Sequence, residues 1–146
     1  MLGHFETHIL RDMGRRALLY VEDDEATFFL LALALKEADA SIDLYRAADG
    51  EEALAFLQHP EDFRDAPRPD LILLDLNLPK KGGIEVLSEV KADPALKSIP
   101  VVMFSSSDRA DDKVQSLGLG AKEYVTKPRS LDNFLEVVKR VCLGES

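Results

Sequence analysis

The stretch LILLDLNLP at residues 71–79 decides the fold of this 146-residue chain. Its first four residues are all apolar, which predicts a strand buried on both faces, as strands of parallel sheets are. The apolar run ends at a single carboxylate, Asp75, and the segment 79–83 predicts a turn. The neighbouring segments are therefore expected to supply parallel partner strands and the helices that cover them.

Strand and helix patterns alternate on both sides of this stretch. Short apolar runs with β propensity predict strands, and runs of strong helix formers predict helices. The expected strands are 17–21, 42–47, 71–74, 99–104 and 122–125; the expected helices are 25–38, 51–58, 84–92, 108–117 and 130–143, with Asp49 and Ser130 as N-caps. Residues 59–69 hold three prolines and are expected to form a loop. This order predicts an α/β fold: a doubly wound, five-stranded parallel sheet of order 2-1-3-4-5, as in the flavodoxin-like class.

The composition bounds the function. The chain has 18 basic and 27 acidic residues, a formal net charge of -9. That balance argues against nucleic acid, which needs a basic surface, and against an anionic membrane as partners. The single cysteine, Cys142, cannot form an internal disulfide, and neither a signal peptide nor a membrane-spanning run is recognisable. A cytoplasmic location is therefore expected.

One domain accounts for most of the chain. Residues 1–16 are expected to form an N-terminal arm and residues 17–143 the domain itself. Only three residues follow position 143, so no output domain is expected.

Chemistry-bearing residues follow four of the five expected strands. Glu22 and Asp23 come after the first strand, Asp75 after the third, Ser105 after the fourth and Lys127 after the fifth. Ligand sites of open parallel sheets lie beyond the carboxyl ends of the strands. Three acids, a hydroxyl and a lysine are therefore expected to converge at one edge of the sheet.

The charges of this set point to a metal and a phosphoryl group. Three adjacent carboxylates repel one another unless a cation lies among them, and Mg²⁺ is the hard divalent ion that such oxygen ligands suit. One carboxylate can attack a phosphoryl group to form an aspartyl phosphate. Two negative groups about 4 Å apart repel by roughly 1 kcal/mol in water and about 4 kcal/mol at an effective dielectric constant of 20. Mg²⁺, Lys127 and the Ser105 hydroxyl would offset that repulsion.

Four motifs in this order resemble the signature of response-regulator receiver domains: VEDD at 21–24, LLDLNLP at 73–79, VMFS at 102–105 and YVTKP at 124–128. The resemblance covers residues 17–143 and implies the receiver fold. It implies that Asp75 is the phosphoacceptor and that Asp23 binds Mg²⁺ directly. Glu22 would act through water, and the backbone carbonyl of Asn77 would be a further ligand.

The same resemblance assigns the remaining positions. Ser105 and Lys127 would contact the phosphoryl group, and Ser105 and Tyr124 would form the conformational switch. The Lys127–Pro128 bond would be cis. The implied function is a single-domain two-component response regulator that takes a phosphoryl group from a histidine kinase and signals by protein contact or onward phosphorelay.

Two features make the resemblance more specific: the segment 67–83 and the expected lack of an output domain. In both, the chain resembles stand-alone receivers paired with bacterial phytochrome histidine kinases. The expected partners are therefore a sensor histidine kinase of the phytochrome type and a second copy of the chain in a homodimer.

The first expected helix offers a partner surface. A core stripe is expected at Thr27, Leu30, Leu31, Ala34 and Ala38. Phe28, Phe29 and Leu33 then flank it, and at least one phenylalanine is expected to be exposed. This patch is assigned to the phosphorylated domain of the kinase or, failing that, to the dimer partner.

Two other functions use a similar framework. An aspartate-nucleophile phosphatase needs a second aspartate two positions after the first, where this chain has Asn77. A pseudo-receiver would be a binding module with an idle site, and the intact set of acids, hydroxyl and lysine argues against it. The chain also lacks the phosphate-binding loops that flavin or GTP binding needs.

Overall fold

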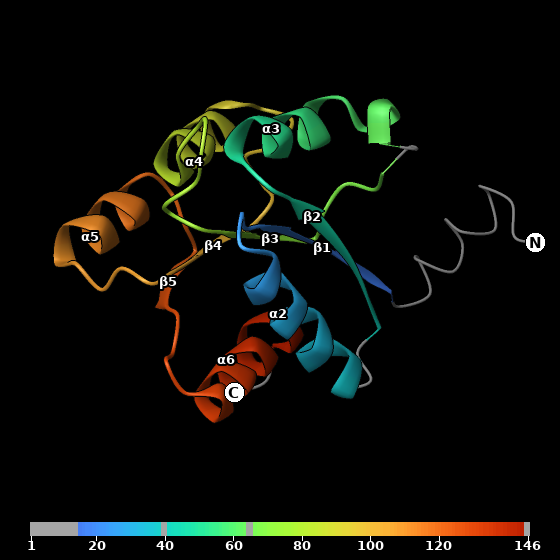
Figure 1. The fold of residues 1–146 in the computed structure, drawn as a ribbon. Helices are drawn as coiled ribbons and strands as arrows, with labels where there is room; N and C mark the ends of the chain where they lie inside the picture. Colours follow the sequence, from blue (N-terminus) through green and yellow to red (C-terminus); the bar gives the residue numbers. More distant parts are fainter. Residues whose placement is uncertain (1–14, 39–40, 64–65, 145–146) are drawn as a thin grey trace, which may run out of the picture.

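The structure is a computed structural model that describes residues 15–38, 41–63 and 66–144. Five parallel strands form one sheet in the order β2-β1-β3-β4-β5, as the sequence predicts (Figure 1). The strands are β1 (Arg16–Val21), β2 (Ile42–Ala47), β3 (Leu71–Leu74), β4 (Val101–Ser105) and β5 (Glu123–Thr126). The helices are α2 (Glu25–Glu37), α3 (Gly50–Gln58), the 3₁₀ turn η1 (Pro60–Phe63), α4 (Gly83–Ala92), α5 (Ala110–Gly118) and α6 (Leu131–Leu143).

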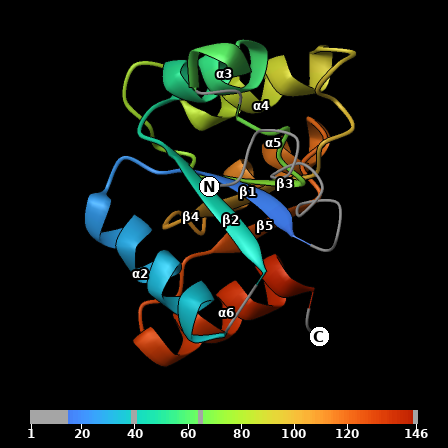
Figure 2. The same cartoon turned by 90° about the vertical axis from the view of Figure 1, so that its right-hand side faces the viewer.

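The helices form a layer on each face of the sheet. Helices α2 and α6 lie on one face, and α3, α4 and α5 lie on the other (Figures 1 and 2). Successive residues of β1 serve opposite layers: Leu19 and Val21 pack with α3 and α4, whereas Leu18 and Tyr20 pack with α2 and α6. This alternation explains why the central strands are apolar throughout.

The register brings the strand ends to one edge. Val21 pairs with Leu74, and the N–H of Asp75 donates to the carbonyl of Val21 at 3.1 Å. At the other side of the sheet, the N–H of Lys127 donates to the carbonyl of Ser105 at 2.7 Å. The backbone ladder therefore fixes the acidic, hydroxyl and lysine positions relative to one another.

Helix caps confirm the predicted starts of two helices. The side chain of Asp49 accepts from the N–H of Glu52 at 2.8 Å, and Ser130 accepts from the N–H of Asn133 at 3.2 Å. Strand β4 begins two residues later than predicted, because the N–H of Ile99 closes a turn onto Leu96 at 2.9 Å. None of the helices in the described ranges is long and apolar enough to cross a bilayer.

The buried face of α2 agrees with the prediction at Leu31 and Ala34 and differs from it at Leu30 and Leu35. Leu31, Ala34 and Leu35 are buried, whereas Leu30 is 39% exposed. The helix is apolar nearly all round, so its periodicity alone does not identify the side that meets the sheet. Phe29 is 62% exposed, which confirms that at least one of the two phenylalanines is accessible. Phe28, by contrast, is partly buried against the core, so it is not part of an open patch.

The bond before Pro128 and the N-terminal arm are the remaining expected features of the chain. The Lys127–Pro128 bond is trans, so the expectation of a cis bond is wrong; trans is the ordinary preference for a peptide bond before proline. The expected arm at residues 1–16 lies outside the described residues except for Arg15 and Arg16, and Arg16 already pairs with Ile42 as the first residue of β1.

Candidate functional site

Three carboxylates meet at the edge of the sheet. Glu22, Asp23 and Asp75 each place one oxygen within 4.8 Å of the others. Glu22 and Asp75 are buried, with 1% and 7% of their surface exposed, whereas Asp23 is open to solvent. The structure thus brings together the acids that follow β1 and β3, as the parallel topology predicts.

Close packing of α4 holds the backbone around Asp75. A side chain at Gly83 would place its Cβ 2.1 Å from the carbonyl oxygen of Asp75, so only glycine fits there. The N–H of Gly83 donates to the carbonyl of Leu76 at 2.9 Å, and the N–H of Asn77 donates to Asp75 Oδ1 at 3.2 Å. These contacts fix the direction of the Asp75 side chain.

Lys127 bridges the two buried carboxylates. Its Nζ donates to Glu22 Oε1 and, at 2.9 Å, to Asp75 Oδ2, and its side chain is 12% exposed. Burial alone lowers the pKa of Lys127, but the hydrogen bond to Glu22 and the charge of Asp75 outweigh it, and the net shift is upward. Lys127 therefore carries its positive charge at neutral pH.

Glu22 is the most enclosed acid of the site. The Tyr20 hydroxyl donates to Glu22 Oε1 at 3.0 Å, and the N–H of Asp24 donates to Oε2 at 3.2 Å. Burial raises the pKa of Glu22, and Lys127 only partly opposes this. Three carboxylates against one ammonium leave about two negative charges when all are ionised, which suits a divalent cation of the hard, oxygen-preferring kind.

A hydroxyl and a phenol occupy the next strands. Ser105 at the end of β4 is fully buried, and its Oγ accepts from the N–H of Ser107 at 3.3 Å. The hydroxyl of Tyr124 on β5 donates to the carbonyl of Ser107 at 2.7 Å. Ser105 and Tyr124 are therefore both connected to the same residue of the β4–α5 loop.

Sequence reasoning missed two residues that contact the acidic loop. Tyr20 donates to Glu22, and Arg46 of β2 donates to the backbone carbonyls of Glu22 and Asp23. Arg46 pairs directly with Tyr20 across β1 and β2. The charge of Arg46 near the end of the otherwise mostly apolar β2 was the available signal in the sequence. Only the register between β1 and β2 shows that this residue lies beside the acidic loop.

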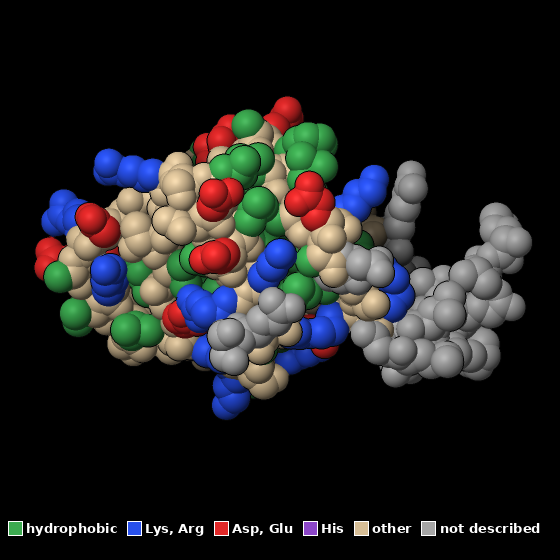
Figure 3. All heavy atoms as spheres, turned by 90° about the horizontal axis from the view of Figure 1, so that it is seen from below, with side chains coloured by type: hydrophobic (Ala, Val, Ile, Leu, Met, Phe, Trp, Pro, Cys, Tyr) green, Lys and Arg blue, Asp and Glu red, His purple; other side chains and the backbone are tan. Residues whose placement is uncertain are grey.

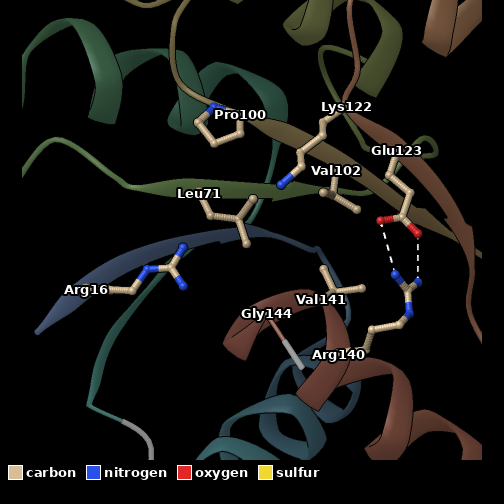
Figure 4. Close-up of a pocket in the computed structure, with 9 residues that line it drawn as sticks. All are labelled: Arg16, Leu71, Pro100, Val102, Lys122, Glu123, Arg140, Val141 and Gly144. Carbon is tan, nitrogen blue, oxygen red and sulfur yellow. Dashed lines mark hydrogen bonds and ion pairs between the residues drawn. The ribbon is translucent and has the colours of Figure 1, made fainter. Parts of the chain in front are cut away.

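A cavity lies at the opposite edge of the sheet. It has a volume of about 500 Å³ and is lined by residues at the amino ends of the strands, such as Arg16, Leu71 and Pro100, and by the end of α6 (Figure 4). Arg140 closes one side through two bonds to Glu123, at 3.3 and 2.7 Å. None of the acidic site residues lines it, so this cavity is separate from the site.

Known proteins share this architecture. Residues 18–139 match the family model described as the response regulator receiver domain. The chain is 43% identical over 126 residues to response regulator Rcp1 of Synechocystis sp. (strain ATCC 27184 / PCC 6803 / Kazusa), and the match covers 86% of each protein.

Solved structures agree with the sequence match. The Mn(2+)-bound form of Rcp1 is similar with a TM-score of 0.82 and 41% identity, over 90% of this chain and 96% of that one. The phosphorylated cyanobacterial phytochrome response regulator RcpA has a TM-score of 0.82 and 42% identity, over 87% of this chain and 91% of that one. The bacteriophytochrome response regulator AtBRR has a TM-score of 0.72 and 35% identity, over 90% and 96%.

Proposed function

The chain belongs to the response regulator receiver family, and from this premise we propose that Asp75 accepts the phosphoryl group. A carboxylate oxygen of Asp75 attacks phosphorus, and the P–N bond of a kinase phosphohistidine breaks, leaving neutral imidazole after protonation. The observation that carries the proposal is the position of Asp75, with two further carboxylates and the Lys127 ammonium around it.

The acidic residues fit a divalent cation. Asp23 and Asp75 would hold Mg²⁺ through their carboxylates, with the carbonyl of Asn77 as a further ligand and Glu22 acting through water. Bound there, the cation supplies positive charge that offsets the repulsion between Asp75 and an incoming phosphoryl group. The binding of Mn²⁺ by Rcp1 supports a divalent site of this kind.

Lys127 and Ser105 complete the site on the other side. Lys127 already contacts Asp75, so its ammonium lies where a phosphoryl oxygen on Asp75 needs a partner. The Ser105 hydroxyl would donate to a second oxygen of the same group. Serine supplies that hydrogen bond with its one O–H.

The switch would run through the β4–α5 loop. When the Ser105 hydroxyl turns to the phosphoryl group, its hydrogen bond from the Ser107 N–H is disturbed. Tyr124 is tied to the carbonyl of the same Ser107, so a shift of this residue reaches β5. We expect Lys127→Ala to remain phosphorylatable but to lose this response, a shift of about 1–3 kcal/mol in the balance of the two states.

The partner is proposed to be a histidine kinase of the phytochrome type, because relatives include phytochrome response regulators. Phe29, Leu30 and Leu33 of α2 form the proposed docking patch; they are 62%, 39% and 41% exposed. From below, the side on which α2 and α6 lie, apolar side chains are visible between charged ones (Figure 3). The helix that carries the patch begins two residues after Asp23.

A homodimer is proposed as well, through α6 and β5 or through the flank of α2. Sedimentation at high micromolar concentration, with and without a phosphoryl mimic, would measure it. A monomer under both conditions would rule the dimer out.

The proposal is tested with acetyl phosphate and Mg²⁺. We expect the wild-type chain to be labelled and Asp75→Asn to remain unlabelled, with Asp70→Asn as the control carboxylate. Undiminished labelling of Asp75→Asn would place the acceptor elsewhere. A wild-type chain that folds but takes no label from acetyl phosphate or a kinase would favour the pseudo-receiver, and turnover of free phosphate esters would favour the phosphatase.

A further inference from the structure

Arg46 contacts the backbone of the acidic loop rather than its carboxylates. Its Nε donates to the carbonyl of Glu22 at 3.1 Å, and its Nη2 donates to the carbonyl of Asp23 at 3.0 Å. The planar guanidinium presents parallel N–H groups, so it can engage two successive carbonyls at once. The side chain is 26% exposed, which leaves most of it in the protein.

The guanidinium is also held from the side of α2. Its Cζ lies 5.6 Å from the centroid of the Phe28 ring, within the range of a cation–π contact. The ring of Phe28 stacks on Tyr20 with centroids 6.0 Å apart, and the Tyr20 hydroxyl donates to Glu22. The ion pair from Arg46 to Glu25 is 3.9 Å long and Glu25 is 89% exposed, so it contributes little.

We infer that Arg46 is a positioning residue for the divalent-metal site, holding the carboxylates of Glu22 and Asp23 beside Asp75 by clamping the backbone between them. The inference rests on the proposed function. The three carboxylates lie within 4.8 Å of one another, and the Lys127 ammonium bonds to only two of them. The repulsion that remains favours movement of the loop away from β3, and the Arg46 clamp opposes that movement. The backbone bond from the Glu22 N–H to the Ala47 carbonyl, at 3.0 Å, secures only the start of the loop.

The clamp should affect metal affinity rather than the phosphoryl-transfer step. Arg46 bonds to carbonyls, so its loss leaves Asp75, Ser105 and Lys127 in place. Residues that orient metal ligands from behind typically change metal affinity by about 10–100-fold when they are replaced. Because Arg46 supplies only two of the hydrogen bonds that hold the loop, we expect the lower end, about tenfold.

The test compares Arg46→Gln and Arg46→Lys with the matched control Arg140→Gln, an arginine at the opposite edge of the sheet. The Mg²⁺ dissociation constant is measured from amide NMR shifts, and labelling by acetyl phosphate is followed as a function of Mg²⁺. For Arg46→Gln we expect the dissociation constant to rise about tenfold while the rate at saturating Mg²⁺ stays within about twofold of wild type. The dissociation constant of Arg46→Lys, whose ammonium is one compact donor group, should lie between those of wild type and Arg46→Gln. The dissociation constant of Arg140→Gln should match that of wild type.

Other results would overturn the inference. An unchanged dissociation constant for Arg46→Gln, or a fall in the saturated rate with no change in affinity, contradicts the positioning role. If Arg46→Gln does not fold, Phe28→Leu keeps the apolar contact and removes only the aromatic face under the guanidinium, and its affinity for Mg²⁺ must still decrease. The NMR titration needs no phosphorylation, so it separates failure of this inference from failure of the proposed function.

Discussion

Replacing Lys127 with methionine removes the ammonium that contacts both buried carboxylates of the site. Breaking a buried ion pair on one side typically costs about 3–5 kcal/mol, because the remaining charge has no partner. Glu22 can escape part of this cost. Its pKa is already raised by burial and rises further without Lys127, so the carboxylate takes up a proton instead of staying charged.

The sign of the pH dependence follows from that shift. Because the pKa of Glu22 is higher in the folded than in the unfolded chain, the folded state binds the proton more tightly. Relative to wild type, the variant is therefore most stable when the pH is below the pKa that Glu22 has in the unfolded chain. It loses stability as the pH rises through the higher pKa that Glu22 has in the folded chain. We expect Lys127→Met to lower the free energy of unfolding by about 3 kcal/mol at pH 8 and by about 1 kcal/mol at pH 5.

The assay is urea unfolding followed by circular dichroism at both pH values, in the absence of Mg²⁺. Lys97→Met, at an exposed lysine in the loop before β4, is the control and should change stability by less than about 0.5 kcal/mol. An equal loss at pH 5 and pH 8 would refute the reasoning, because it would mean that Glu22 does not take up a proton when Lys127 is absent.

Three further results are expected. Cys142 should resist a thiol reagent at pH 8 in the folded protein and react fully in urea, because burial raises its pKa to about 12; rapid reaction of the folded chain would contradict this. Gly83→Ala should destabilise the chain by about 1–3 kcal/mol or more and reduce labelling, because its Cβ would lie 2.1 Å from the Asp75 carbonyl oxygen. The control Gly82→Ala, whose Cβ would lie 3.9 Å from the nearest atom, should be tolerated. Equal stability of the two variants in urea would show that the backbone relaxes freely. Phe29→Ser should slow transfer from the kinase but leave acetyl phosphate labelling intact, and parallel loss of both activities would remove the docking assignment.

The position of the acidic site could be predicted because the ends of the strands can be recognised in the sequence. An apolar run that ends in Asp75 must be a strand end, and parallel strands put all such ends at one edge. The N-caps Asp49 and Ser130 are equally local, because each needs only its own side chain and the N–H three residues later.

Features that depend on three-dimensional neighbours were missed or mistaken. The buried side of α2 was only partly recognised: Leu31 and Ala34 of the predicted stripe are buried, but Leu30 is not. A helix that is apolar nearly all round has no distinct polar face to identify the rest. The contact of Arg46 with the acidic loop depends on the register between β1 and β2, which no periodicity encodes. The partial burial of Phe28 has the same origin, since it comes from Tyr20 on a neighbouring strand.

The burial of Cys142 also makes the chain a convenient host for spectroscopic probes. It is the single cysteine of the sequence, and the sequence has no tryptophan. A thiol introduced at an exposed position, such as Val114 on α5, would therefore be the one site that a fluorescent or spin label modifies in the folded protein. Movements of α5 on phosphorylation could be followed in this way without first replacing the native cysteine.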